Sequence, residues 1–218
     1  MNIFKQVTLA DSLSVLNALL GFSAISYVLI NGLDKNAFTF FYLAVLADGA
    51  DGLVASKTEK SPFGKELDSL ADAISFGAFP AVILVKYEPN LFPFASLILA
   101  FSILRLARFN VLKFEHFYGL PTIVSALIIS SLIRISVLAE IIAISSLILS
   151  IFMVSDVVYP RIRNPLVLFL VAFIIISAMF LDEMVYAILL ISTIYLIYSP
   201  IREVLKWKEG KKLHLKQE

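Results

Sequence analysis

The chain has 218 residues, of which 60% are hydrophobic and 35 are charged (18 Lys and Arg plus 17 Asp and Glu). This apolar share and a mean hydropathy of +0.91 exclude a soluble enzyme, a secreted domain and a disordered chain. The chain contains no cysteine, so disulfide frameworks, thiol nucleophiles and thiolate metal sites are excluded as well.

The N-terminal residues 1–10 have apolar side chains at positions 3, 4, 7 and 9 beside Lys5 and Gln6. This pattern predicts a short amphipathic helix in the membrane interface. A frayed terminus is the alternative interpretation of the same residues.

Long charge-free stretches follow. A hydrocarbon core about 30 Å thick takes roughly 20 helical residues to cross, so such stretches, extended by a turn into their flanks, predict transmembrane helices. They comprise residues 12–33, 36–47, 73–85, 89–104, 117–133, 141–155, 164–181 and 184–201. The sequence therefore predicts an all-α, polytopic integral membrane bundle of about eight transmembrane helices. A six-helix alternative stays open at the pair 121–138 and 141–157, which a short turn near Ala139 and Glu140 would join.

The distribution of basic residues predicts the orientation of this bundle. With eight crossings, 15 of the 18 Lys and Arg residues fall on the side of the termini, and Lys35, Lys86 and Arg134 fall on the other. Cytoplasmic loops are richer in Lys and Arg than loops on the opposite side. Both termini are therefore predicted to be cytoplasmic, with the protein in the cell membrane.

Four acids lie near the ends of the second and third predicted helices, where an ionisable group costs on the order of 3 kcal/mol to insert. Asp48 and Asp51 lie at the cytoplasmic end of one helix, and Asp68 and Asp72 lie at the start of the next. Residues three or four apart share a helix face. Two antiparallel helices joined by a short loop would thus bring the four carboxylates together just inside the cytoplasmic interface.

Four like charges at one depth call for a compensating cation. Neither His lies in these helices and the chain lacks Cys, so the oxygen ligands favour Mg²⁺, Mn²⁺ or Ca²⁺ over Zn²⁺. Two such ions would serve a displacement at phosphorus. Gly49, Gly52 and Gly64 leave room for a nucleotide diphosphate to approach the backbone.

Three other interpretations of the acids stay open. In the first, the acids form interfacial salt bridges with Lys57, Lys60, Lys65 or Arg residues. In the second, the acids line a cation path in a transporter or channel. The second interpretation predicts acids spread through the membrane depth, whereas these four gather at one end. The third is a catalytically inactive helical scaffold.

The stretch Asp48-Gly-Ala-Asp-Gly-Leu-Val-Ala, followed by Gly64-Lys-Glu-Leu-Asp-Ser-Leu-Ala-Asp, resembles the signature of the CDP-alcohol phosphotransferase family. This resemblance implies a homodimeric membrane enzyme that moves a phosphatidyl-type group from a CDP-linked lipid to an alcohol and releases CMP. It implies metal ligation by Asp48, Asp51 and Asp68, with Asp72 as a ligand of the second ion and as the catalytic base. The CDP site that it implies comprises Gly52, Ala55 and Gly64, and we predict that Ser56 and Lys57 belong to this site as well.

The chain departs from the family signature between its two halves. The family has Arg where Ser56 stands, and the stretch from there to Gly64 is one residue shorter here. Lys57 is predicted to take over the contact of the missing Arg with the nucleotide.

Further segments are similar to the phosphatidylserine synthase branch of the family, which implies L-serine as the acceptor, CDP-diacylglycerol or CDP-archaeol as the donor, and Mg²⁺ or Mn²⁺ as the cofactor. These segments are 11–21, 69–77 with Pro80, 105–110, 119–121, 153–155 and 159–160. Arg105 and Arg108 are predicted to bind the serine carboxylate, because guanidinium groups pair well with carboxylates. Glycerol phosphate and inositol phosphate stay open as other acceptors.

The resemblance also predicts an organisation for the single membrane domain 1–218. Residues 11–160 would form the catalytic helices, with 1–10 as the interfacial helix before them. Residues 161–205 would add two helices to a six-helix family core, and their sequence carries no recognisable motif. Residues 206–218 would form a basic cytoplasmic tail.

Overall fold

The computed structural model describes residues 7–55, 61–111, 117–160, 162 and 164–214. Its helices are α1 (Leu9–Asn31), α2 (Lys35–Ala55), α3 (Gly64–Asp72), the π-helical segment η2 (Ala73–Ala78), α4 (Phe79–Tyr87), the 3-10 turn η3 (Pro89–Leu91), α5 (Phe92–Val111), α6 (Thr122–Arg134), α7 (Ala139–Val154), α8 (Pro165–Ala178) and α9 (Glu183–His214). The described residues contain no strand; Tyr118 and Val158 form an isolated bridge.

Helices α3, η2 and α4 are continuous, as are η3 and α5, so the described chain forms eight helical stretches. Five of these are long and apolar enough to cross a membrane: Leu9–Asn31, Lys35–Ala55, Gly64–Tyr87, Pro89–Val111 and Glu183–Glu203. Helices α6, α7 and α8 are apolar but shorter, with 13, 16 and 14 residues. The prediction of an all-helical chain with several helices long and apolar enough to cross a membrane is confirmed for the described residues.

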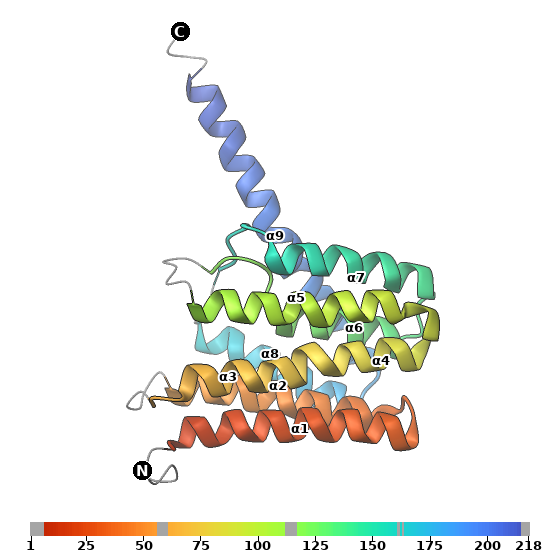
Figure 1. Ribbon diagram of the computed structural model, residues 1–218. Coiled ribbons are helices and arrows are strands. Elements are labelled where there is room, and N and C mark those ends of the chain that lie inside the picture. The colour runs from red at the N-terminus through yellow and green to blue at the C-terminus, as the bar shows by residue number, and fades with distance from the viewer. Residues whose placement is uncertain (1–6, 56–60, 112–116, 161, 163, 215–218) are drawn as a thin grey trace.

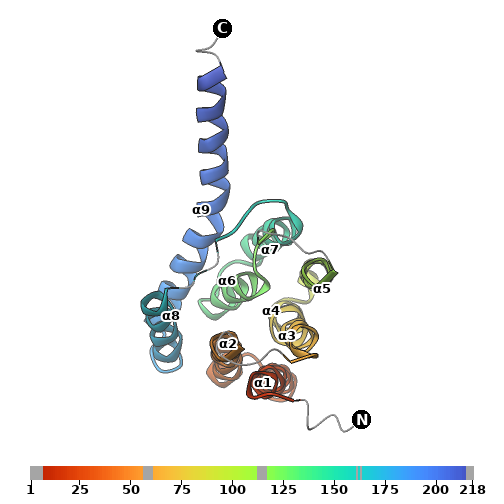
Figure 2. The ribbon, with the colours of Figure 1, turned by 90° about the vertical axis from the view of Figure 1, so that its left-hand side faces the viewer.

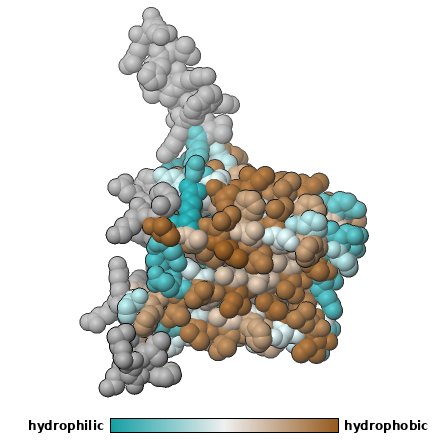
Figure 3. Space-filling view, in the orientation of Figure 1, coloured by the Kyte–Doolittle hydropathy of each residue, from teal (hydrophilic) through white to brown (hydrophobic). Residues whose placement is uncertain are grey.

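The helices of the bundle lie side by side, and the chain turns back at its two ends (Figure 1). On the face shown in Figure 3, an apolar belt separates hydrophilic residues at these two ends. This is the distribution expected of a bundle whose middle lies in hydrocarbon. The distal part of α9 leaves the bundle and extends away from it (Figure 2).

Helix α1 begins at a capping box, in which the backbone N–H of Thr8 donates to Asp11 (2.7 Å) and that of Asp11 donates to the Thr8 hydroxyl (3.2 Å). These bonds satisfy donors that have no partner inside the helix. The helix ends at Gly32, whose φ of 94° suits a residue without a Cβ. Residues 1–6 of the predicted interfacial helix lie outside the described part of the chain.

One predicted boundary requires correction, and one segment is more helical than its description as a tail implies. The turn expected near Ala139 and Glu140 spans residues 135–138, where Ser136 adopts a left-handed φ of 56° that ends α6. Helix α9 continues to His214, within the predicted basic tail 206–218. The described part of the predicted basic tail is therefore helical.

The core that positions the site is built from aromatic and small residues. Phe41 of α2 stacks on Phe79 of α4 with ring centroids 4.8 Å apart, and it meets Phe76 of η2 edge to face. Gly21 of α1 lies directly against Ser75 of η2. Since small residues let helix backbones approach closely, α1 packs tightly on the segment that follows Asp72.

Candidate active site

The ends of α2 and α3 bring three acids together. Carboxylate oxygens of Asp48, Asp68 and Asp72 all lie within 4.8 Å of one another, and each of the three residues is half-buried. Asp48 lies two turns before the end of α2, while Asp68 and Asp72 lie one turn apart on α3. The predicted meeting of the two helix faces is thus present for three of the four acids.

The fourth acid, Asp51, is directed toward α1. It is buried, with 7% of its surface exposed, and its carboxylate accepts a hydrogen bond from the Ser14 hydroxyl. Asp51 remains close enough to Asp68 for an electrostatic interaction. It therefore lies beside the three-acid cluster, in the space between that cluster and α1.

Helix α1 contributes polar groups that the sequence analysis did not assign to the site. Asn17 donates from Nδ2 to Oδ1 of Asp72 (3.4 Å). Asp11, Ser14 and Asn17 are all at most 2% exposed. Their three-residue spacing in an otherwise apolar helix is the signal that would have identified this face. The first-helix pattern at residues 11–21 had pointed to the enzyme family without giving these side chains a partner.

The π-helical segment η2 begins directly after Asp72. Single π-helical turns inside α-helices often occur at functional sites. The Ser75 hydroxyl in this segment donates to the backbone carbonyl of Asn17 (3.0 Å). This bond and the close contact with Gly21 hold α1 in register with α3, and so fix Asn17 opposite Asp72.

Arg105 of α5 provides positive charge beside the acids. Its guanidinium interacts electrostatically with Asp48, Asp68 and Asp72, and it lies over the ring of Phe117, 5.0 Å from the centroid. Only 6% of the residue is exposed. Its Nε has no hydrogen-bond partner among the residues that the structure describes. A buried cation with an unused donor is suited to binding an anionic group.

Arg108 has different partners from Arg105. Its Nη1 donates to the carbonyls of Val154 (3.0 Å) and Ser155 (3.3 Å), and its Nη2 pairs with Asp156 (2.5 Å). The expectation that both arginines reach one site stays a prediction. Arg108 caps the C-terminal end of α7, where carbonyl groups without helical partners favour a cation.

Helix α9 approaches the site through Tyr195, which meets Tyr159 of the segment between α7 and α8. The rings of Tyr159 and Tyr195 stack with centroids 5.5 Å apart. Tyr195 donates to the carbonyl of Pro160 (2.9 Å), and Tyr159 donates to that of Leu196 (3.2 Å). Tyr195 also interacts electrostatically with Arg105. Helix α9 is therefore part of the surroundings of Arg105.

The residues predicted to bind CDP lie at the same end of the bundle where the structure describes them. A Cβ added at Gly49 or Gly52 of α2 would meet no atom of the described residues within 4 Å, so open space adjoins the backbone there. Ala55 ends α2 and Gly64 begins α3, where an added Cβ would lie 3.4 Å from Oδ1 of Asp11. Ser56 and Lys57 lie outside the described residues.

The cluster formed by Asp48, Asp68 and Asp72 fits a divalent cation. Its donors are all carboxylate oxygens, which suit hard ions such as Mg²⁺ and Mn²⁺. Arg105 supplies one positive charge against three half-buried carboxylates, which leaves negative charge to be balanced. The number and identity of the ions stay a prediction.

Comparison of the sequence with known proteins identifies one protein family. The sequence model of the family described as CDP-alcohol phosphatidyltransferase matches residues 7–198. The match includes α8 and the first half of α9, for which the sequence analysis found no motif.

Named relatives align over much of their length. A CDP-diacylglycerol–serine O-phosphatidyltransferase of Methanocaldococcus jannaschii is 32% identical over 206 residues, covering 93% of this chain and 98% of that protein. An archaetidylserine synthase of Methanothermobacter thermautotrophicus is 40% identical over 166 residues, covering 72% and 71%. A CDP-diacylglycerol–serine O-phosphatidyltransferase of Helicobacter pylori is 31% identical, covering 73% and 76%.

Proposed function

The chain belongs to the CDP-alcohol phosphatidyltransferase family, and from this membership we propose that it transfers a phosphatidyl-type group from a CDP-linked lipid to the hydroxyl of L-serine. CMP is released, and the lipid donor is CDP-diacylglycerol or CDP-archaeol. The names of the relatives support serine as the acceptor and phospholipid biosynthesis as the role. The observation that carries the proposal is the meeting of Asp48, Asp68 and Asp72 within 4.8 Å beside a buried arginine.

The metal site of this proposal comprises Asp48, Asp51, Asp68 and Asp72, which hold Mg²⁺ or Mn²⁺. When bound, such ions neutralise charge on the diphosphate and on the departing CMP. Gly52, Ala55, Ser56, Lys57 and Gly64 form the CDP site. The open space beside Gly52 supports this assignment.

The transfer step in this proposal is direct. Asp72 accepts the proton of the serine hydroxyl, and the serine oxygen forms a bond to the phosphorus next to the lipid. The bond from that phosphorus to the oxygen bridging the two phosphates breaks, and its electron pair leaves with CMP. The hydrogen bond from Asn17 orients the Asp72 carboxylate for this role.

The serine carboxylate binds Arg105 in this proposal. The buried guanidinium has an Nε without a partner among the described residues, and a carboxylate would supply one. The guanidinium of Arg108 binds Asp156 and the end of α7. A contact between Arg108 and serine stays a prediction.

The proposed topology has eight crossings, both termini in the cytoplasm and the acids at the cytoplasmic face of the cell membrane. It is supported by the excess of 15 Lys and Arg residues against three and by the chain turning back at two ends of the bundle (Figure 1). The catalytic helices span residues 11–160, with 161–205 as additional helices, and the enzyme is a homodimer.

Release of CMP by purified protein tests the function. The assay contains a CDP-lipid and Mn²⁺ or Mg²⁺, with L-serine, glycerol phosphate, inositol phosphate or no acceptor. We expect serine-dependent release that Asp72→Asn abolishes and that Asp34→Asn, at the opposite end of the bundle, leaves intact. Release with another alcohol would replace serine as the acceptor. No release with any alcohol, from folded protein, would refute transferase activity and favour the transporter interpretation.

A further inference from the structure

Arg105 of α5 contacts aromatic residues as well as the acids. Its guanidinium lies 5.0 Å from the centroid of the Phe117 ring, and it interacts electrostatically with Tyr195 of α9. A divalent cation at the three-acid cluster would compete with the guanidinium for the same carboxylates. Contacts that do not involve the acids are therefore needed to keep Arg105 in one orientation.

Phe117 belongs to one of two chain connections that pair with each other. The backbone N–H of Tyr159, between α7 and α8, donates to the carbonyl of Phe117, between α5 and α6 (2.9 Å). The N–H of Gly119 donates to the carbonyl of Val157 (2.9 Å). These two bonds flank the isolated bridge between the same segments. The position of Phe117 under the guanidinium therefore depends on the position of Tyr159.

Tyr195 fastens these paired connections to α9. Its ring stacks on that of Tyr159 with centroids 5.5 Å apart, and its hydroxyl donates to the carbonyl of Pro160 (2.9 Å). The Tyr159 hydroxyl donates in turn to the carbonyl of Leu196 in α9 (3.2 Å). Helix α9 thus influences the guanidinium in two ways, directly through its own tyrosine and indirectly through the paired connections.

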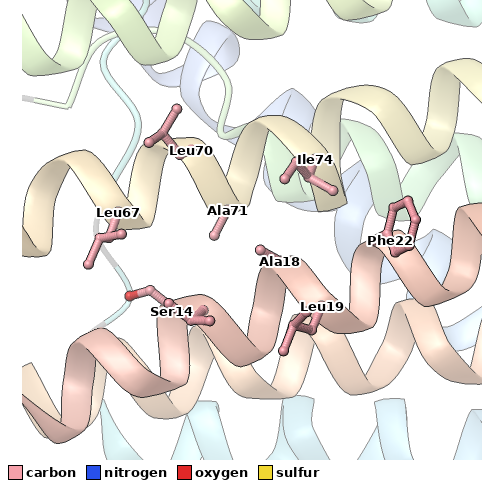
Figure 4. Close-up of a pocket in the computed structure, with 9 residues that line it drawn as sticks. Ser14, Ala18, Leu19, Phe22, Leu67, Leu70, Ala71 and Ile74 are labelled. Carbon is pink, nitrogen blue, oxygen red and sulfur yellow. The ribbon is translucent and has the colours of Figure 1, made fainter. Parts of the chain in front are cut away.

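The groove between α1 and the continuous helix α3–η2, on which Ala18 and Ala71 point toward each other, is unsuited to an anionic acceptor (Figure 4). Its nine described lining residues include no charged side chain, and Ser14 is the one polar residue among them. A carboxylate placed there would lose hydration without gaining a cation. The carboxylate of an acceptor is therefore expected at Arg105, whose Nε has no partner among the described residues.

We propose that Tyr195 is a positioning residue of the acceptor site, which holds the Arg105 guanidinium in the orientation that binds the carboxylate of serine. The inference rests on the proposed function and adds to it a role for α9. Tyr195 touches no reacting atom in this proposal. Its effect is therefore on the affinity for serine, and not on the affinity for the CDP-linked lipid or on the transfer step.

Tyr195→Ala tests this role, with Tyr198→Ala as the matched control in the same helix, where Tyr198 is 52% exposed. We expect Tyr195→Ala to raise KM for serine about tenfold, as for the loss of one hydrogen bond to a charged group, and to change kcat and KM for the CDP-lipid less than about twofold. Tyr195→Phe keeps the ring but loses the bond to Pro160, so its KM for serine should lie between those of Tyr195→Ala and the wild type. Tyr198→Ala should leave all three constants at their wild-type values.

A double-mutant cycle distinguishes positioning of Arg105 from general loosening of the fold. If Tyr195 acts through the guanidinium, Tyr195→Ala should raise KM for serine by less than about twofold in protein that already carries Arg105→Lys. Independent effects of the two substitutions, which multiply, would overturn the proposal. Equal increases in KM for serine and for the CDP-lipid in Tyr195→Ala would overturn it as well.

Chemical modification measures the position of Arg105 without any substrate. Phenylglyoxal reacts with accessible guanidinium groups, and Arg105 is only 6% exposed, so it should react slowly in the wild type. Tyr195→Ala should speed its modification, measured by mass spectrometry against the exposed Arg202, and Tyr198→Ala should not.

An unchanged rate of modification in Tyr195→Ala would overturn the positioning role. Faster modification with an unchanged KM for serine would overturn the link to acceptor binding and leave the proposed function intact. Faster modification in Tyr195→Ala, combined with a wild type that shows no serine-dependent CMP release, would refute the proposed function and with it the acceptor role, while the contact between Tyr195 and Arg105 would stand.

Discussion

The contact between Gly21 and Ser75 is a sensitive point of the fold, and Gly21→Ala probes it. An added Cβ would overlap the Ser75 hydroxyl and would lie only 2.8 Å from the Cα of Ser75. A side chain can rotate away, but a Cα moves only if a helix moves. We therefore expect α1 to shift away from η2.

The expected magnitude combines two opposing effects. Ala is favoured over Gly inside a helix by up to about 1 kcal/mol, whereas overpacking a close contact costs about 1–3 kcal/mol. The net destabilisation is then up to about 2 kcal/mol, which corresponds to a fall in melting temperature of up to about 4–8 °C for a chain of this size. Gly49→Ala is the matched control, because its Cβ would meet nothing within 4 Å in the part of the chain that the structure describes, and it should keep or raise the melting temperature.

The same variant reports on activity. Asn17 lies one turn before Gly21, and its hydrogen bond to Asp72 is already long at 3.4 Å. A shift of α1 would break this bond, so kcat should fall by about tenfold or more, as for the loss of a hydrogen bond to a charged group. Thermal unfolding in detergent and CMP release measure the two effects, and Ser75→Gly in the same chain should restore part of each. A variant as stable and as active as the wild type would refute the reasoning that this contact sets the position of α1.

Three further predictions concern the site and the opposite end of the bundle. Asp68→Asn should reduce CMP release at least a hundredfold without lowering the melting temperature. Chelation of divalent ions should abolish release until Mg²⁺ or Mn²⁺ is restored. Activity that survives both changes would refute the metal site. Arg105→Lys should raise KM for serine about tenfold and change KM for the CDP-lipid less, because Lys lacks the planar guanidinium fork; equal changes in both constants would argue against a serine contact. The hydrogen bond from Arg134 (2.6 Å) lowers the pKa of Asp182 from 3.8, so its stabilisation is present above pH 3.8 and is lost as the pH falls through the folded value. The melting temperature should therefore fall less steeply below about pH 4 in Asp182→Asn than in the wild type, and identical slopes would refute the linkage.

The spacing of charged residues predicts the helical stretches well, because a lipid environment forces apolar segments into helices whose backbone bonds are satisfied internally. It does not predict η2, because the sequence pattern of a π-helical turn is that of an α-helix. Pro80 offers a physical reason for the irregularity. It has no N–H to donate to the carbonyl of Phe76, and the π-helical segment Ala73–Ala78 lies just before it.

The site is predictable as far as spacing within a helix determines it. Asp68 and Asp72 share a face, and the short connection to α2 brings Asp48 to them. The spacing of Asp11, Ser14 and Asn17 marks a polar face of α1, but the helices that this face meets are determined by packing, so the partners of Ser14 and Asn17 were not predicted. The neighbours of Arg105 and Arg108 also depend on packing between helices. Arg105 lies beside the acids of α2 and α3, and Arg108 binds carbonyl groups at the end of α7.

The stacked pair of Tyr159 and Tyr195 bears on the order in which the protein is made. All four acids lie within the first 72 residues of the chain, whereas Tyr195, which interacts with Arg105, lies in the last helix. During synthesis the acids can therefore enter the bilayer and meet long before the surroundings of Arg105 are complete. A nascent chain that has not yet inserted α9 would hold the acids of the donor site without the finished surroundings of Arg105, so activity should begin only when the whole bundle has assembled.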